Sequence, residues 1–375
     1  MPRPSGLAAA GSTFGSRQPV FRFMVNASAR ETRTDIQALR GLAVLLVVLY
    51  HTRLNFLAAG YLGVDVFFVI SGFLITGLVK RAIEQKRFLF SEFYFRRAKR
   101  LLPAAYLTFL VTAALAPFFL DGNELRDFAE QMIGAVTFTG NLVLWQQTGY
   151  FQTAAELKPL LHVWSLAIEE QYYLILPAAL VLIPSRYWLA CSMGILIVSL
   201  VLWVVGGYFK PVATFYLLPT RAWELAMGSI GALIAARNRL RQLASLLFVP
   251  SVIALFAIPV FPIGRSHPGP DAIIVCVATL LVILRNHPWS NVTAPARALA
   301  WVGDFSYSLY LVHWPIFAFA SNAWVGEPPG LLPPIVRIFA FLLSLSLAYL
   351  LYRYVELPVR RTKIRISKPL LATTL

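Results

Sequence analysis

The feature that most limits how this sequence can fold is its series of long apolar segments. A helix needs about 20 mostly apolar residues to cross the roughly 30 Å hydrocarbon core of a bilayer. Eleven segments approach this length: 40–58, 61–79, 101–120, 132–146, 161–183, 187–206, 222–236, 243–263, 271–285, 305–324 and 331–352. They lack the period-2 alternation of membrane β-strands, so helices are the expected form. The sequence therefore predicts an all-α polytopic membrane protein.

The composition excludes an ordinary soluble enzyme. Hydrophobic residues make up 58% of the 375 residues and charged residues 13%, whereas soluble domains carry about 25% charged residues. The two cysteines, Cys191 and Cys276, lie in apolar segments and are expected to be buried, reduced thiols. The net charge of +16 is better explained by basic cytoplasmic loops than by a nucleic-acid partner.

Loop charges predict the orientation. Residues 80–100 hold eight basic and two acidic side chains, and residues 353–368 hold six basic side chains and one acidic one. Residues 121–131, in contrast, hold one basic and four acidic side chains. The positive-inside rule places the basic segments in the cytoplasm and 121–131 outside. About ten crossings with both ends cytoplasmic satisfy this rule if 132–146 is re-entrant or peripheral. The predicted parts are a basic tail (1–34), a membrane domain (35–358) and a second basic tail (359–375).

Arg40 and His51 share one face of the first predicted span, because eleven residues make about three turns, or about 16 Å. Arg40 is expected at the cytoplasmic edge and His51 near the middle of the membrane. A buried neutral imidazole can act as a general base, and a guanidinium can hold a phosphate. An equally good interpretation of this pair alone is an interfacial arginine and a histidine that bonds a neighbouring helix.

A second basic group, Arg96, Arg97 and Arg100, precedes the third predicted span. Spacings of three and four residues place these side chains on one helical face, which suits a polyanionic phosphate ligand. Taken alone, the ordinary basicity of a cytoplasmic loop explains them better.

Asp65 is a charge within the second predicted span and is therefore a functional hypothesis. It could orient a histidine or bond a sugar hydroxyl, or it could be a structural partner of Arg221 or Arg337. Three small residues of the same segment permit close helix packing: Gly63, Ser71 and Gly72.

Among the predicted spans, 161–183 carries the most polar side chains, namely His162, Ser165, Glu169 and Glu170. Spacings of three and four residues put the first three on one face. Burying all of them in packing alone would cost too much free energy. We therefore predict a wet cavity at the outer side of the membrane.

Two further polar sites have competing interpretations. Arg221 and Glu224 form an i,i+3 pair, for which a self-neutralising structural role is slightly favoured. His313 lies beside Pro315, so it either bonds the kinked backbone or belongs to the site. No His/Cys/Asp cluster has the spacing of metal ligands, so no metal is expected.

Together these motifs resemble the acyltransferase-3 family of polytopic membrane O-acyltransferases, which includes bacterial surface-polysaccharide O-acetylases. The resemblance runs from about 35 to 361. It rests on six segments in the same order: Arg40 to His51, 63–76, 96–100, 161–171, 220–224 and 307–315.

The resemblance implies acetyl-CoA as cytoplasmic acyl donor, a bacterial inner-membrane location, and a cell-surface glycan acceptor such as lipopolysaccharide O-antigen or exopolysaccharide. It implies His51 as base or transient acyl carrier. The catalytic group would be His51, Arg40, Asp65 and Glu169. The CoA ligands would be Arg40, Arg96, Arg97 and Arg100. The acceptor ligands would be His162, Glu170, Arg221, Glu224 and His313.

The branch resembled most closely often carries an extracytoplasmic SGNH domain after the spans, and no Gly-Asp-Ser segment follows them here. The expectation is that a separate periplasmic SGNH-type acyltransferase completes the transfer or that the membrane domain acts alone among membrane lipids. The alternative function is a glycolipid transporter or flippase, which would not need the CoA-binding arginines.

Overall fold

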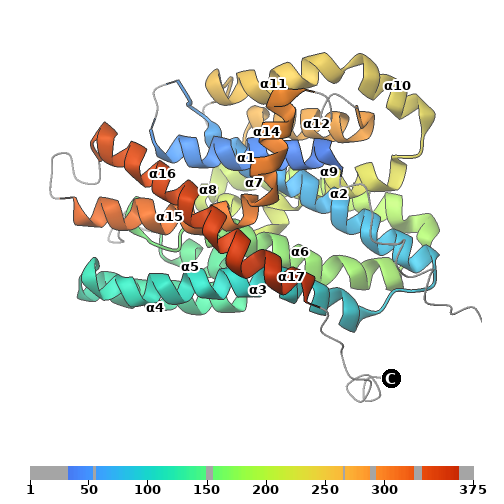
Figure 1. Ribbon diagram of the computed structural model, residues 1–375. Helices are drawn as coiled ribbons and strands as arrows, with labels where there is room; N and C mark the ends of the chain where they lie inside the picture. The colour runs from blue at the N-terminus through green and yellow to red at the C-terminus, as the bar shows by residue number, and fades with distance from the viewer. Residues whose placement is uncertain are drawn as a thin grey trace, which may run out of the picture. The chain divides into compact units, whose positions relative to one another are not determined.

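The computed structural model of this chain describes residues 33–53, 56–148, 155–264, 267–287, 293–324 and 332–362. Within these ranges all regular structure is helical, which confirms the all-α prediction (Figure 1). The predicted tails, 1–34 and 359–375, lie mostly outside the described residues.

The described helices match some predicted apolar segments closely, such as 305–324, but others poorly: the first helix ends at 51 rather than 58, and the third begins at 90 rather than 101. They are α1 (Thr34–His51), α2 (Gly63–Glu84), α3 (Phe90–Leu115), α4 (Gly122–Thr137), α5 (Gly140–Gln146), α6 (Val163–Leu182), α7 (Trp188–Phe209), α8 (Pro211–Tyr216), α9 (Leu218–Ile234), α10 (Asn238–Leu246), α11 (Phe248–Val260), α12 (Pro270–Arg285), α14 (Ala294–Asp304), α15 (Ser306–Ala323), α16 (Pro334–Leu351) and α17 (Leu357–Arg361).

Six helical stretches in the described part of the chain are long and apolar enough to cross a membrane: Thr34–His51, Gly60–Glu84, Phe90–Phe118, Val163–Leu182, Ser185–Phe209 and Pro334–Arg361. A seventh arises if α10 and α11, bent by 56°, form one span. Helices α9 and α12 are only 17 and 16 residues long, and α15 includes Ser306, Ser308 and His313. The structure supports a multi-pass membrane protein, and the count of ten crossings stays a prediction.

The predicted segment 132–146 is broken in the structure. Asp121 begins α4 with a capping box, in which its carboxylate accepts from the backbone N–H of Glu124. Phe138 ends α4 in the left-handed conformation, with a φ of 57°, and α5 starts two residues later. The segment therefore consists of the last six residues of α4 and the whole of α5, and its re-entrant or peripheral position stays a prediction.

Glycines set how closely the helices pack. A Cβ at Gly72 of α2 would lie 1.9 Å from the Leu225 carbonyl oxygen, and one at Gly63 would lie 2.2 Å from that of Ala43. The close-packing prediction is confirmed for these two residues. For Ser71 it stays a prediction, and its hydroxyl donates a hydrogen bond to Glu169 of α6 at 2.6 Å.

Two groups of helix ends position the polar side chains. At one end of the bundle, the start of α15 lies against α3 and against the segment that follows α16, since Tyr307 bonds the Leu101 carbonyl and Ser308 bonds Glu356. At the other end, the last residue of α1, His51, packs against Trp314 of α15, and the next residue, Thr52, accepts a hydrogen bond from Arg337 at the start of α16. We call these the basic end and the cavity end.

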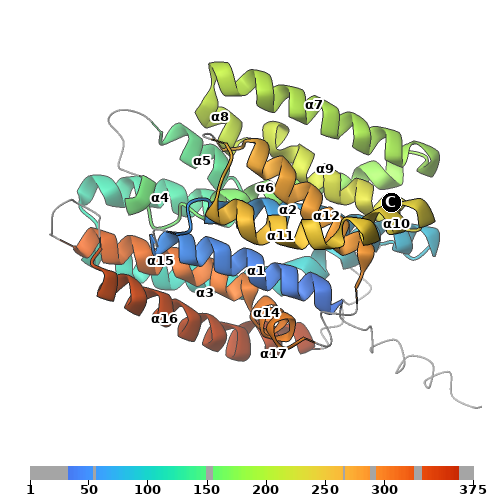
Figure 2. The same ribbon diagram turned by 90° about the horizontal axis from the view of Figure 1, so that it is seen from above.

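One helix departs from the common direction. Helix α14 crosses α1 steeply, whereas α15 and α16 lie side by side in both views (Figures 1 and 2). A Cβ at Gly303 of α14 would lie 1.9 Å from the Gln37 carbonyl oxygen, so α14 lies directly against the first turns of α1. This contact holds the part of α1 that carries Arg40.

Candidate active site

Four arginines gather at the basic end from three parts of the chain. Arg100 of α3 lies within electrostatic range of Arg40, Arg97 and Arg360. Three of these four, Arg40, Arg97 and Arg100, were predicted from the sequence. Arg360, the fourth, falls in the predicted tail, but the helical stretch that begins with α16 continues past that boundary to Arg361.

The carboxylates at the basic end only partly neutralise these guanidiniums. Arg97 pairs with Glu170 at 2.7 Å and lies over the ring of Tyr173. Arg360 pairs with Glu356 at 3.2 Å. The Nε atoms of Arg97 and Arg100 are buried without a hydrogen-bond partner. Since buried polar groups are nearly always bonded, this cluster is suited to an anionic ligand.

Arg96 does not join this cluster. Its side chain is 68% exposed and pairs with Glu92 one turn earlier on α3. Arg96 is only about 40° from Arg100 around the helix, but its pairing with Glu92 directs it to solvent, so the prediction that three arginines together form the CoA site is wrong for Arg96. Arg97 and Arg100 instead face inward.

Polar residues of α6 lead from the basic end into the protein. Glu169 accepts hydrogen bonds from Ser71 and Tyr173. It also lies within electrostatic range of Arg40 and Tyr310. Glu170 faces Arg97, as its pair shows. The two adjacent carboxylates thus contact different residues. Glu169 lies between the arginines of the basic end and Tyr310, which leads to the histidines.

Three histidines form a cluster toward the cavity end. The ring of His313 lies 5.5 Å from that of His51 and 5.7 Å from that of His162. The His313 Nδ1 lies 2.7 Å from the Tyr310 carbonyl oxygen and 3.1 Å from that of Leu309. Because carbonyls only accept, Nδ1 carries the proton and Nε2 is an acceptor. That Nε2 and both ring nitrogens of His162 are buried without a hydrogen-bond partner.

Tyr310 and Ser165 complete the path between the histidines and Glu169. Their hydroxyls are 2.5 Å apart, and Tyr310 also donates to the His162 carbonyl at 3.1 Å. Tyr310 was not predicted as a site residue, although it lies one turn before His313 in the same motif. His162, Ser165 and Glu169 do follow one path along α6, as their spacing predicted.

His51 lies at the end of its helix rather than at its middle. It is the last residue of α1, because the chain turns at Thr52 and at Arg53, whose φ is 52°. The predicted span, 40–58, extends beyond the end of α1, and the mid-membrane position of His51 stays a prediction. Its ring packs against Trp314, with 4.4 Å between ring centres.

A cavity of about 520 Å³ opens beside His51. Its lining comes from the end of α1, the segment before α6, α15 and the residues around the start of α16: Tyr50, His51, Arg53, Leu57, Ala58, Glu156, Leu161, Trp314, Phe317, Ser321, Leu332 and Arg337. Asp65, His162 and Glu169, predicted to form the outer cavity, are not among them. The volume falls in the range of small-ligand sites.

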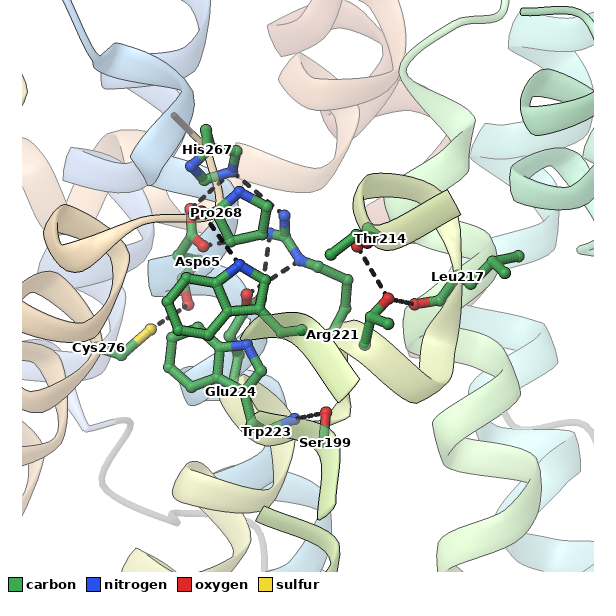
Figure 3. Close-up of polar contacts among 12 residues, drawn as sticks. Asp65, Ser199, Thr214, Leu217, Arg221, Trp223, Glu224, His267, Pro268 and Cys276 are labelled. Atoms are coloured by element: carbon green, nitrogen blue, oxygen red, sulfur yellow. Dashed lines mark hydrogen bonds and ion pairs between the residues drawn. The ribbon is translucent and has the colours of Figure 1, made fainter. Parts of the chain in front are cut away.

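Asp65, Arg221 and Glu224 form a separate, fully buried ion cluster (Figure 3). Arg221 lies 3.1 Å from Asp65 and 2.9 Å from Glu224, and none of these side chains has exposed surface. The structural interpretations of the Arg221–Glu224 pair and of Asp65 as a partner of Arg221 fit these contacts. The catalytic grouping of Asp65 with His51 does not.

His267 joins this cluster from the loop before α12. Its Nε2 lies 3.2 Å from Arg221 and 3.7 Å from Asp65. Burial and the neighbouring Arg221 guanidinium lower the pKa of His267 well below 6.5, so the neutral ring accepts from Arg221. No local sequence pattern predicts this contact, because His267 and Arg221 are 46 residues apart.

The two cysteines do not share one environment. Cys276 is buried, with its thiol 3.9 Å from the Asp65 carbonyl oxygen. Cys191 on α7 is exposed, so the prediction of two buried thiols is wrong for Cys191. Among the described residues no group of three His, Cys, Asp or Glu side chains could hold a metal ion.

Comparisons with known proteins bear on the chemistry of this site. A family model described as an acyltransferase domain matches residues 33–353. The peptidoglycan O-acetyltransferase OatA of Listeria monocytogenes is 28% identical over 356 residues, which cover 89% of this chain and 56% of that protein. The putative peptidoglycan O-acetyltransferase YrhL of Bacillus subtilis is 31% identical over 350 residues, 87% of this chain and 54% of YrhL.

The O-acetyltransferase OatA of Staphylococcus aureus is 32% identical over 353 residues, which cover 87% of this chain and 57% of that protein. The chain thus spans little more than half the length of these curated relatives. No solved structure matches it.

Proposed function

Because this chain belongs to the acyltransferase family whose domain covers residues 33–353, we propose that it is a membrane O-acyltransferase. The donor is a cytoplasmic acyl-CoA, acetyl-CoA in the simplest case. The acceptor is a hydroxyl of a cell-envelope glycan on the opposite side of the membrane. The names of the relatives favour a cell-wall glycan over the O-antigen or exopolysaccharide expected from the sequence.

One observation supports this proposal most strongly: polar groups connect the two ends of the bundle. They run from the arginines through Glu169, Tyr310 and the three histidines to the cavity. Charged and polar groups inside a membrane protein are expensive and mark functional paths. A donor bound at the basic end and an acceptor bound in the cavity would need such a connection.

In the proposed reaction, Arg40 and Arg100 hold CoA phosphates, and the pantetheine arm runs toward His51. The acceptor oxygen attacks the thioester carbonyl, the C–O bond forms and the C–S bond breaks. His51 takes the hydroxyl proton as general base and returns it to the CoA thiolate, so that atoms and charge balance. In a two-step variant, His51 carries the acyl group briefly before it passes to the glycan or to a separate SGNH-type acyltransferase.

His313 has a different role in this proposal from the acceptor binding expected earlier. Its Nδ1–H is held by two carbonyl oxygens, so its Nε2 can accept an N–H from His51. Such a bond fixes the tautomer of a catalytic histidine, as the third member of a catalytic triad does. His313 is thus a positioning residue for His51.

The test measures acetyl transfer by the full chain in nanodiscs, with labelled acetyl-CoA and a cell-wall glycan, and mass analysis of the product. We expect His51→Ala and Arg40→Ala each to abolish transfer while the protein remains folded in the membrane. His287→Gln is the matched control, because its ring stacks on Phe248, outside this path. Normal transfer by both variants would contradict the proposal. Glycolipid movement without acetylation would instead support the flippase alternative.

A further inference from the structure

The charges that line the cavity are uneven. Among the lining residues there are two guanidiniums, Arg53 and Arg337, but only one carboxylate, Glu156. Glu156 pairs with Arg53, and both side chains are largely exposed. The charge of Arg337 is therefore not matched by a carboxylate among the residues that line the cavity.

Arg337 is held in place without being neutralised. In the first turn of α16, its Nε donates to the Leu332 carbonyl, and its Nη1 donates to the carbonyls of Thr52 and Arg53 at 3.2 and 3.4 Å. These bonds fix the guanidinium plane at the turn that directly follows His51. In the described part of the chain, Nη2 has no hydrogen-bond partner, so its two N–H groups are available to a ligand.

The remaining lining suits a sugar ring. Tyr50, Trp314 and Phe317 contribute aromatic surface beside His51. Ligand sites typically combine such apolar surface with a few fixed polar groups that orient the ligand. A fixed guanidinium at such a site pairs best with a carboxylate or phosphate, through charge-assisted hydrogen bonds.

We infer that the glycan acceptor carries an acidic group, a carboxylate or a phosphate, which Arg337 binds so that the neighbouring hydroxyl faces His51. This inference rests on the proposed acyl transfer and adds the chemical class of the acceptor. Arg337 is here a specificity-determining residue. Its bonds to Thr52 and Arg53 place the acidic group at a fixed distance from the end of α1.

The experiment compares acceptors that differ only in charge. The full chain is placed in phosphatidylcholine nanodiscs with acetyl-CoA. The acceptors are a uronic-acid oligosaccharide, its carboxyl-reduced neutral form and a phosphodiester-linked saccharide. The measured quantity is the ratio of kcat/KM for each acidic acceptor to that for the neutral one. This ratio does not depend on how much of a variant folds, because the active fraction cancels.

We expect the wild-type chain to prefer at least one acidic acceptor by about tenfold or more, as a charge-assisted bond provides. Arg337→Gln should bring the ratio close to one, and Arg337→Lys should retain part of the preference. Arg241→Gln, at the exposed N-terminal part of α10, is the control, and this variant should show the same preference for acidic acceptors as the wild-type chain.

Two results would overturn the inference: equal use of all three acceptors by the wild-type chain, or an unchanged ratio in Arg337→Gln. Either result would leave the proposed function intact, because acetyl transfer would still occur. Failure of the wild-type chain to acetylate any acceptor, also in a parallel reaction that contains a periplasmic SGNH-type acyltransferase, would contradict the proposed function itself.

Discussion

At the residue scale, this protein buries polar side chains in two different ways. The cluster of Asp65, Arg221 and Glu224 is closed, with its main charge partners inside it. Both this cluster and the group of Arg100 and the histidines contain buried polar atoms without a hydrogen-bond partner, among them Asp65 Oδ2, Arg221 Nε and Glu224 Oε1 of the ion cluster. The difference is in charge pairing: among the described residues no carboxylate forms an ion pair with Arg100, His162 or His313, whereas Arg221 has two such partners. An ion cluster that contains its own counter-charges stabilises or orders packing, whereas buried groups without a counter-charge are available to a ligand or a proton.

The closed cluster leads to a stability prediction. Arg221→Met removes the cation from two buried carboxylates, and breaking such a cluster typically costs about 3–5 kcal/mol. We expect a markedly lower melting temperature in detergent, measured by tryptophan fluorescence or nanoscale calorimetry. Arg241→Met, at an exposed position, is the control. An unchanged melting temperature of Arg221→Met would show that the cluster does not stabilise the fold.

The role of His313 predicts a kinetic signature. Glutamine cannot replace both the Nδ1–H donor and the Nε2 acceptor of the ring, so His313→Gln should lower kcat by about a hundredfold. The KM values for acetyl-CoA and glycan should change little, because His313 contacts neither in the proposed reaction. If KM for the glycan rises while kcat stays constant, His313 binds the acceptor, as the sequence alone had suggested.

The arginines of α3 give a matched comparison. Arg100→Gln removes a buried guanidinium of the basic cluster and should raise KM for acetyl-CoA by about tenfold or more. Arg96→Gln removes a guanidinium that is 68% exposed and paired with Glu92, so its effect should be much smaller. Equal effects of the two substitutions on KM would contradict the assignment of the CoA site to the inward face.

At the element scale, close helix contacts through glycine hold the site together. Helices α2 and α9 touch at Gly72 and Gly228, where a Cβ would lie 1.9 and 2.1 Å from backbone oxygens of the opposite helix. Small residues let helix backbones approach closely inside a membrane. The same helix pair brings Asp65 to Arg221, so packing and the ion cluster depend on each other.

This contact predicts a strong effect of one methyl group. Gly228→Ala should force α2 and α9 apart and lower both thermal stability and activity, since an overpacked interior costs about 1–3 kcal/mol. Gly194→Ala on α7 is the matched control, because a Cβ there has nothing within 4 Å. The comparison uses melting temperatures of the two variants in the same detergent. Equal melting temperatures would show that the interface adapts freely.

At the scale of the whole molecule, the two helix-end groups define opposite ends of the bundle. The basic end holds the arginines, and the cavity end holds His51 and Arg337. The positive-inside rule places the basic end in the cytoplasm. The predicted orientation and the proposed direction of acyl transfer therefore depend on the same charges.

Cysteine labelling tests this orientation. In a Cys191→Ser background, Asn123→Cys should react with an impermeant maleimide in spheroplasts, whereas Arg239→Cys should react only after lysis. Cys191 must be replaced because it is exposed, while Cys276 is fully buried. Labelling of Arg239→Cys in sealed spheroplasts would contradict the predicted orientation and would place 237–241 outside.

The sequence by itself determined the all-helical fold and most of the residues that the site uses. Apolar run length fixes helix formation in lipid, because backbone groups there must bond within their own segment. Helical spacing then places His162, Ser165 and Glu169 on one path. These are local properties of the chain, so the sequence is sufficient to predict them.

Only the tertiary structure decided which polar residues meet. Arg221 meets His267, His51 lies beside His313, and Arg337 reaches Thr52, across separations that no spacing rule covers. Local sequence left open whether Asp65 lies in a cavity or pairs with Arg221, and the structure shows the pair. The packing of α2 against α9 brings Asp65 to Arg221. This pairing is favoured because a buried ion in a low-dielectric interior needs a counter-ion beside it.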